Sequence, residues 1–365
     1  MKIPFVDLKA NYLAIKTEMD SALLKVVGEA SFIKGAELDE FEKNWASACS
    51  AKHCAGMSNG TSSLEIILKS MNIGHGDEVI MPSHTFIATA EAAVNCGARP
   101  VFVDCLADTA LIDAKKVHEA ISPRTKAVII VDLYGQPADH DAVKKSLEGK
   151  NIRIIQDAAQ SHLARYKHQV TGSYCEITSF SFYPGKNLGA YGDAGAAVTN
   201  DDSLYKKIKM LSDHGRTTKY EHEYSGTNAR MDNIQAAVLN VKLKHVREWN
   251  EKRKEAAAEY KRSLKGVVEF IETDKNCDPV YHLLVAKVPD RDKLISFLAV
   301  RGVSTGIHYP VPLHLQPAFK YLGYKKGDLP VSEKLAGEIL SLPIFPEITG
   351  EQINFVVQSL KEYYK

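Results

Sequence analysis

The residues most able to do chemistry are a lysine, an aspartate and a run of hydroxyl groups, and they lie in three separate motifs. Lys186 lies in the glycine-rich stretch "SFYPGKNLGAYGDAGA", directly after an apolar run that is typical of a strand. Asp157 ends another apolar run in "IIQDAAQSH", where Gln160 follows three residues later. The third motif is "SNGTSSLEIILKS" at residues 58–70, where glycine and hydroxyl groups precede an amphipathic helical pattern.

Each motif also has an ordinary structural interpretation. Serine and threonine are common N-caps, an aspartate can cap a helix, and a lysine in a loop is usually a solvated charge. Neither a P-loop nor a G-x-G-x-x-G fingerprint is present. Taken together, however, an anion-binding helix start, a carboxylate at a strand end and a later amine are the three groups that pyridoxal phosphate needs. The lysine would form a Schiff base with this cofactor.

These motifs must be positioned by an α/β fold. Short apolar, β-branched runs alternate with helical patterns, which predicts βαβ units and a largely parallel sheet, with strands at residues 78–82, 100–104, 127–132, 152–157 and 178–182. Several of these runs end in aspartate. Ligands of open α/β sheets bind beyond the carboxyl ends of the strands, so we expect the site at that edge.

The second half of the chain predicts a connector and a smaller unit. Residues 231–264 have apolar residues at helical spacing and predict one long helix leaving the large domain. A strand at 279–288, a helix over 290–302 and a terminal helix over 350–365 predict a small α+β domain. We expect a large domain at 1–245, with the N-terminal segment included, and a small domain at 246–365.

Composition limits the partners. The 365 residues include 46 basic and 45 acidic ones, so the net charge creates no strong electrostatic field that would favour binding to nucleic acid or to a membrane surface. Six scattered cysteines without a C-x-x-C pair argue against a zinc site or a disulfide frame. No signal-peptide pattern or long apolar stretch is present, and we expect a soluble, cytoplasmic protein that binds no metal.

Several motifs in order resemble the DegT/DnrJ/EryC1/StrS family of pyridoxal-phosphate-dependent sugar aminotransferases over nearly the whole chain. They are "SNGTSSL", "GDEVIMPSHTFIATAEA", "QDAAQSH", "SFSFYPGKNLGAYGDAGAAVTNDD", "GTNARMDNIQAAVL" and "IHYPVPLHLQPAF". Two positions depart from the family pattern: Gln156 stands where glutamate is common, and Leu163 stands where glycine is common. The resemblance implies a fold-type I transferase, with a large domain built on a mostly parallel mixed sheet and a smaller C-terminal α+β domain.

The resemblance also implies roles for individual residues. Lys186 would be the catalytic Schiff-base lysine and proton shuttle, Asp157 would pair with the pyridine nitrogen, and Gln160 would contact the ring hydroxyl. The other implied cofactor contacts are the phosphate ligands Gly60, Thr61, Ser62 and Ser181, the stacking residue Phe86, and Asn228, which would reach the cofactor phosphate of the neighbouring subunit. The implied substrate-binding residues are Tyr183, His308, Tyr309 and His314.

The implied reaction moves the amino group of L-glutamate to a nucleotide-linked keto sugar, in a homodimer with active sites at the subunit interface. "NLGAYGDAGA" resembles members that aminate carbon 3, for amino sugars of O-antigens, other glycans or natural products. Two alternatives stay open: amination at carbon 4 of a 4-keto-6-deoxyhexose, and a non-catalytic regulator that binds pyridoxal phosphate or an amino sugar.

Overall fold

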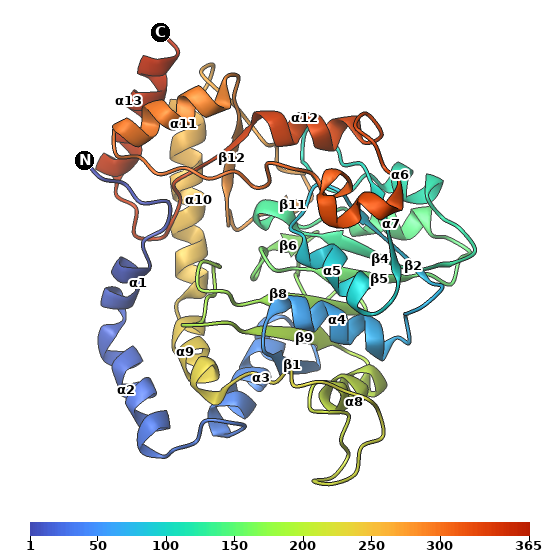
Figure 1. Cartoon of the computed structure of the whole chain (residues 1–365). Coiled ribbons are helices and arrows are strands. Elements are labelled where there is room, and N and C mark those ends of the chain that lie inside the picture. The colour runs from blue at the N-terminus through green and yellow to red at the C-terminus, as the bar shows by residue number, and fades with distance from the viewer.

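A computed structural model describes all of residues 1–365 (Figure 1). Its centre is a seven-stranded sheet in which only β9 runs antiparallel to its neighbours. The strand order is β1 (His53–Met57), β9 (Gly195–Thr199), β8 (Ile177–Ser181), β5 (Arg153–Asp157), β4 (Thr125–Val131), β2 (Glu78–Pro82) and β3 (Arg99–Val103). The mixed, mostly parallel α/β fold predicted from the sequence is confirmed.

Helices cover both faces of this sheet. One face packs against α4 (Gly60–Ser70), α5 (Ala88–Asn95) and α8 (Asp202–Leu211). The other face packs against α3 (Ala36–Ala48), α6 (Ala114–Glu119), α7 (His140–Ser146) and α9 (Asn233–Leu243). Alternate residues of β4 enter the two apolar layers, Ile129 on one side and Ile130 on the other. A sheet buried on both faces explains why its strands read as continuous apolar runs.

A second, smaller unit follows the long helix α10 (Val246–Ser263). Its antiparallel sheet has the order β10 (Glu269–Phe270), β12 (Leu284–Lys287) and β13 (Ile339–Leu342). The helices of this part of the chain are α11 (Arg291–Val300), α12 (Pro330–Glu338) and α13 (Gly350–Tyr363), with two short 3₁₀ helices, η2 (Leu313–Leu315) and η3 (Pro317–Leu322). Thr349 and Gln352 close a capping box at the start of α13.

The first residues of the chain lie against this smaller unit. Ile3 forms a bridge with Val303 and is fully buried in the apolar cluster of the C-terminal part. Two helices, α1 (Leu8–Ala14) and α2 (Lys16–Gly28), then run along the outer edge of the molecule, and α2 packs beside α9 (Figure 1). The N-terminal segment therefore links the C-terminal unit to the large sheet.

Two elements differ from their predictions. The helix expected over 231–264 is divided into α9 and α10, because the amides of Lys244 and His245 bond to carbonyls three residues back and tighten the turn there. The strand expected over 279–288 is shortened to β12, and its first residues instead dock on Gly135, where Val280 N donates to the carbonyl oxygen.

A third, small sheet joins β6 (Arg165–Tyr166), β7 (Gln169–Val170) and β11 (Cys277–Asp278). None of the helices combines the length and the apolar character needed to cross a membrane.

Candidate active site

A cavity of about 710 Å³ lies at the carboxyl ends of the parallel strands. The large domain lines it with the start of α4, the end of β5 and the turn after β8, and the smaller unit adds His308 and Tyr309. Phe5, near the N-terminus, also lies on the wall. The volume is within the usual range for small-molecule sites, and the cavity is where the strand pattern predicts it.

The start of α4 forms an anion site on the cavity wall. Asn59 caps the helix, and its Oδ1 accepts from the amide of Ser62 at 2.7 Å. The amides of Gly60 and Thr61 have no acceptor within the protein. A Cβ at position 60 would lie 2.7 Å from the Cβ of Ser181, so only glycine lets the helix start approach the end of β8 this closely. Free amides at a helix N-terminus beside hydroxyl groups suit a phosphate.

Asp157 is buried at the end of β5 and lines the same cavity. Its carboxylate accepts from Thr89 Oγ1 at 2.9 Å and from the amide of Ala159 at 3.2 Å. Burial raises the pKa of Asp157, and its hydrogen bonds and the nearby Lys186 amine offset part of that effect. A buried carboxylate that lines a cavity and has no salt-bridge partner within the protein is suited to a cationic ligand group.

The orientation of Gln160 is fixed by the backbone next to it. Its Oε1 accepts from the amide of Tyr134 at 2.6 Å, which turns Nε2 toward Tyr309, whose hydroxyl it reaches at 3.3 Å. The amide NH₂ therefore faces the cavity as a donor.

Lys186 projects from the turn after β8, in which its own amide donates to the carbonyl of Tyr183 at 2.8 Å. Its Nζ has no hydrogen-bond partner within the protein and lines the cavity. Burial lowers the pKa of Lys186 to about 8, and the Asp157 carboxylate offsets part of that effect. The side chain is thus an amine that is partly neutral near physiological pH.

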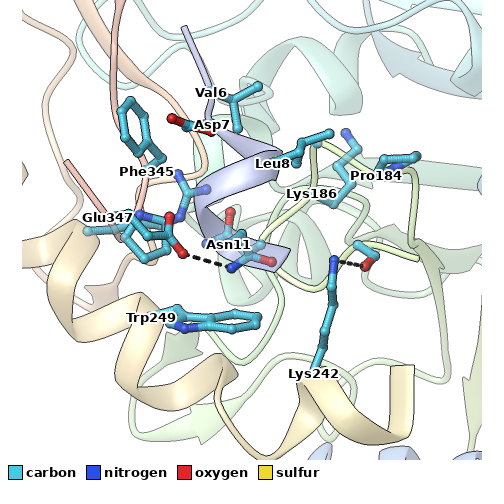
Figure 2. Close-up of a pocket in the computed structure, with 15 residues that line it drawn as sticks. Val6, Asp7, Leu8, Asn11, Pro184, Lys186, Lys242, Trp249, Phe345 and Glu347 are labelled. Carbon is cyan, nitrogen blue, oxygen red and sulfur yellow. Dashed lines mark hydrogen bonds between the residues drawn. The ribbon is translucent and has the colours of Figure 1, made fainter. Parts of the chain in front are cut away.

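On the side away from the cavity, this turn lies against a second set of polar groups (Figure 2). Lys242 of α9 is buried and donates to the carbonyl of Gly189 at 2.8 Å. Nearby, Asn11 of α1 donates to Glu347 at 2.8 Å, and a cavity of about 20 Å³ separates these pairs. Figure 2 shows Lys186 pointing away from this space, so one side of the turn is anchored and the other presents the amine.

Aromatic and imidazole side chains complete the wall. Phe86 is 52% exposed and its ring centroid lies 5.5 Å from that of Tyr309, while Tyr183 is 58% exposed at the rim. His308 stacks on Phe5, and its Nδ1 lies 2.9 Å from Ser341 Oγ. Burial, with a smaller effect from Lys186, lowers the pKa of His308 to about 4, so this imidazole is neutral at physiological pH.

Two predicted residues lie outside the cavity. His314 is buried between Ser83 Oγ, 2.7 Å from its Nδ1, and Glu333 Oε1, 3.0 Å from its Nε2. This placement gives His314 a structural role in fastening the C-terminal segment to the large domain. Asn228 is exposed in the loop before α9, on a bridge with Asp213, and does not line the cavity of its own chain. The other predicted site residues all line the cavity.

Sequence reasoning missed three residues of this region. Thr89 and Tyr134 hold Asp157 and Gln160, and Arg253 of α10 lies on the cavity wall. Arg253 Nη1 donates to the Ile344 carbonyl at 3.0 Å. Thr89 lies in the quoted motif "GDEVIMPSHTFIATAEA", yet no local pattern assigns a role to any of the three, because each acts through a contact with a distant part of the chain.

The described residues fit pyridoxal phosphate. The free amides and hydroxyls at the start of α4 suit its phosphate, the unpaired Asp157 carboxylate suits its protonated ring nitrogen, and the unpaired Lys186 amine suits its aldehyde.

Comparisons with known proteins agree with this geometry. The model of the DegT/DnrJ/EryC1/StrS aminotransferase family matches residues 13–361. The chain is 42% identical over 364 residues to a dTDP-3-amino-3,4,6-trideoxy-alpha-D-glucose transaminase of Streptomyces venezuelae, covering 99% of this chain and 96% of the relative. It is 44% identical over 363 residues, 99% of both chains, to the "erythromycin biosynthesis sensory transduction protein EryC1" of Saccharopolyspora erythraea. The crystal structure of DesV of S. venezuelae superposes with a TM-score of 0.98 at 42% identity, covering 100% of this chain and 99% of that one.

Proposed function

Because the chain belongs to the DegT/DnrJ/EryC1/StrS aminotransferase family, we propose that it moves the amino group of L-glutamate to carbon 3 of a nucleotide-linked 3-keto hexose. The family resemblance predicted from the sequence is confirmed, and the protein is a pyridoxal-phosphate-dependent sugar aminotransferase. The observation that carries the proposal is that Lys186 and Asp157 face one cavity with the free amides of α4.

We assign the chain's own groups as follows. The start of α4 and Ser181 would hold the cofactor phosphate, and the Asp157 carboxylate would keep the ring nitrogen protonated. Gln160 Nε2 would donate to a ring oxygen, and Phe86 would offer its aromatic side chain to the ring. When bound, pyridoxal phosphate supplies an aldehyde that joins a primary amine and a ring that takes up an electron pair.

Lys186 has two tasks in this scheme. Its amine would tether the cofactor, and the same amine, when free, would move a proton during the reaction. The same amine serves both half-reactions, since the second runs the steps of the first in reverse on the keto sugar. A pKa near 8 suits both taking up and giving back this proton near neutral pH.

Carbon 3 is favoured by the relative from Streptomyces venezuelae, which is named for a 3-amino product. The competing assignment is carbon 4 of a 4-keto-6-deoxy sugar. Incubation with L-glutamate and each keto sugar nucleotide, followed by NMR of the product, separates the two. A new amine on carbon 3 supports the proposal, and turnover of the 4-keto sugar alone contradicts it.

A regulatory role is the candidate from another class, and the name of the Saccharopolyspora relative is the reason to test it. A binding module has no need of an unpaired amine beside a buried carboxylate, which favours catalysis. Bound cofactor without turnover of any keto sugar would favour regulation instead.

We further propose a homodimer in which Asn228 serves the partner's site. Large apolar side chains of α1 and α2 are exposed on the single chain: Leu13 at 55%, Leu24 at 70% and Val27 at 53%. A second copy would cover such a surface.

The first experiment is the visible spectrum of the purified protein before and after L-glutamate is added. We expect a yellow cofactor band that L-glutamate replaces with the pyridoxamine spectrum. Lys186→Ala should lack the normal yellow cofactor band, and adding L-glutamate should not produce the normal change to the pyridoxamine spectrum. A protein that stays colourless when pyridoxal phosphate is supplied would contradict the assignment of this site.

A further inference from the structure

Tyr134 lies behind the cavity wall and uses each of its polar groups to hold that wall. Its amide donates to Gln160 Oε1 at 2.6 Å, and its carbonyl accepts from the amide of Leu283 at 3.2 Å. Its hydroxyl is 2.6 Å from the carbonyl oxygen of His308 and 2.8 Å from Nε2 of His84. Gln160, Leu283 and His308 line the cavity, whereas Tyr134 itself does not.

The backbone of Tyr134 is strained. It follows β4 in the short 3₁₀ segment η1 (Leu133–Gly135), with φ 62° and ψ 3°, in the left-handed region that a residue with a Cβ disfavours. Its neighbour Gly135 has φ 98°, and a Cβ there would lie 2.7 Å from the amide nitrogen of His282. Residues in such conformations persist where the surroundings fix them, and they gather at functional sites.

The protons of this cluster have defined places. The phenol has one proton, and the carbonyl of His308 can only accept, so the hydroxyl donates to it. The Nε2 of His84 must then donate to the same hydroxyl. Burial lowers the pKa of His84 to about 4 and raises the pKa of Tyr134, which keeps the imidazole neutral and the phenol protonated at physiological pH.

The two functional groups of Tyr134 act on different parts of the site. The hydroxyl holds the His308–Tyr309 segment, which comes from the smaller unit, and the amide holds Gln160, which comes from the large domain. Gln160 in turn donates to the hydroxyl of Tyr309 at 3.3 Å. A change to the hydroxyl alone should therefore disturb the segment and leave Gln160 in place.

We propose that Tyr134 is a positioning residue for the sugar-nucleotide side of the cavity, where its hydroxyl sets the place of the His308–Tyr309 segment. This inference rests on the proposed function, in which that segment contacts the sugar nucleotide. Tyr134 would thus act on the site indirectly, through its hydrogen bonds, without touching cofactor or substrate.

The test is Tyr134→Phe, assayed with L-glutamate and with dTDP-3-keto-6-deoxyglucose and its UDP-linked 3-keto counterpart. We expect the KM for the sugar nucleotide to rise about tenfold, as the loss of two buried hydrogen bonds predicts. The half-reaction with L-glutamate, followed by the cofactor spectrum, should stay within about twofold because the amide remains. Tyr166→Phe is the matched control: Tyr166 is buried, donates to Asp139 at 2.7 Å and does not line the cavity.

An unchanged KM in Tyr134→Phe, or an equal rise in Tyr166→Phe, would overturn the inference. Should Tyr134→Phe fail to fold, His84→Leu removes the donor that orients the hydroxyl but leaves its bond to the His308 carbonyl, so we expect a smaller rise in KM. No rise at all would show that the orientation of the hydroxyl does not place the segment, and would overturn the inference. The Kd for each sugar nucleotide, measured by calorimetry, tests the inference without turnover. Failure of the wild-type protein to aminate any keto sugar would instead contradict the proposed function.

Discussion

The amine of Lys186 sets a pH dependence for cofactor capture. Only the neutral amine can attack the aldehyde, and burial lowers the pKa of Lys186 to about 8. The rate at which the cofactor-free protein takes up pyridoxal phosphate should rise about tenfold per pH unit below that value and level off above it. Rapid mixing with detection of the bound cofactor's absorbance measures this profile.

Asp157→Asn is the variant that tests whether the Asp157 carboxylate influences this pH profile. The carboxylate raises the pKa of Lys186, so its removal should move the plateau to a lower pH. A rate that still rises at pH 10 in the wild-type protein would mean that the amine is solvated like an ordinary lysine, and the assignment of a buried, tuned amine would fail.

At the residue scale, the sequence identifies groups whose chemistry is local and misses those that act across the fold. Asp157 stands out because it ends an apolar strand, and Lys186 because it lies in the glycine-rich turn after one. Thr89 is 68 residues from the carboxylate that it holds, and Tyr134 is 26 residues from Gln160, so no spacing rule connects them. His314 shares a motif with His308, yet the 3₁₀ turn η2 directs it to Ser83 and Glu333.

At the element scale, the approach of α4 to β8 should decide cofactor affinity. Gly60→Ala places a methyl group against Ser181, and such overpacking costs about 1–3 kcal/mol. The helix start should shift away from the phosphate, with an expected loss of cofactor affinity of roughly tenfold or more. The measurement is equilibrium binding of pyridoxal phosphate, and Gly337→Ala in α12 is the control because no atom lies within 4 Å of its new Cβ. Equal affinities in both variants would contradict a phosphate site at this helix.

Five of the seven strands of the large sheet were predicted, whereas β1, β9 and the break between α9 and α10 were not. All five predicted strands of the large sheet lie within two residues of their expected ranges, because burial on both faces leaves continuous apolar runs. The turn at Lys244 and His245 has no glycine or proline, so propensity favours an uninterrupted helix. It is the packing of α9 on the large domain and of α10 on the smaller unit that divides it.

At the scale of the whole molecule, the site needs parts that the chain brings from both of its ends. The large domain supplies the groups that we propose to hold the cofactor, the C-terminal unit supplies His308 and Tyr309, and the N-terminal segment supplies Phe5. The domain limits at residues 245 and 246 remain a prediction. The position of Ile3 in the C-terminal apolar cluster shows why a linear division describes this chain incompletely.

The proposed dimer extends this sharing of parts to a second copy, and complementation tests it. Lys186→Ala lacks the amine, and Asn228→Asp would place a negative charge beside the partner's phosphate, so each homodimer should be inactive or nearly so. In a mixed dimer, the site that keeps Lys186 receives Asn228 from the other chain and is intact. Co-expression with two different tags should therefore restore about a quarter of wild-type activity, since about half of the dimers are mixed and one of their two sites works. If purified mixed dimers gained no activity, Asn228 would serve its own chain or neither, and the shared site would be wrong.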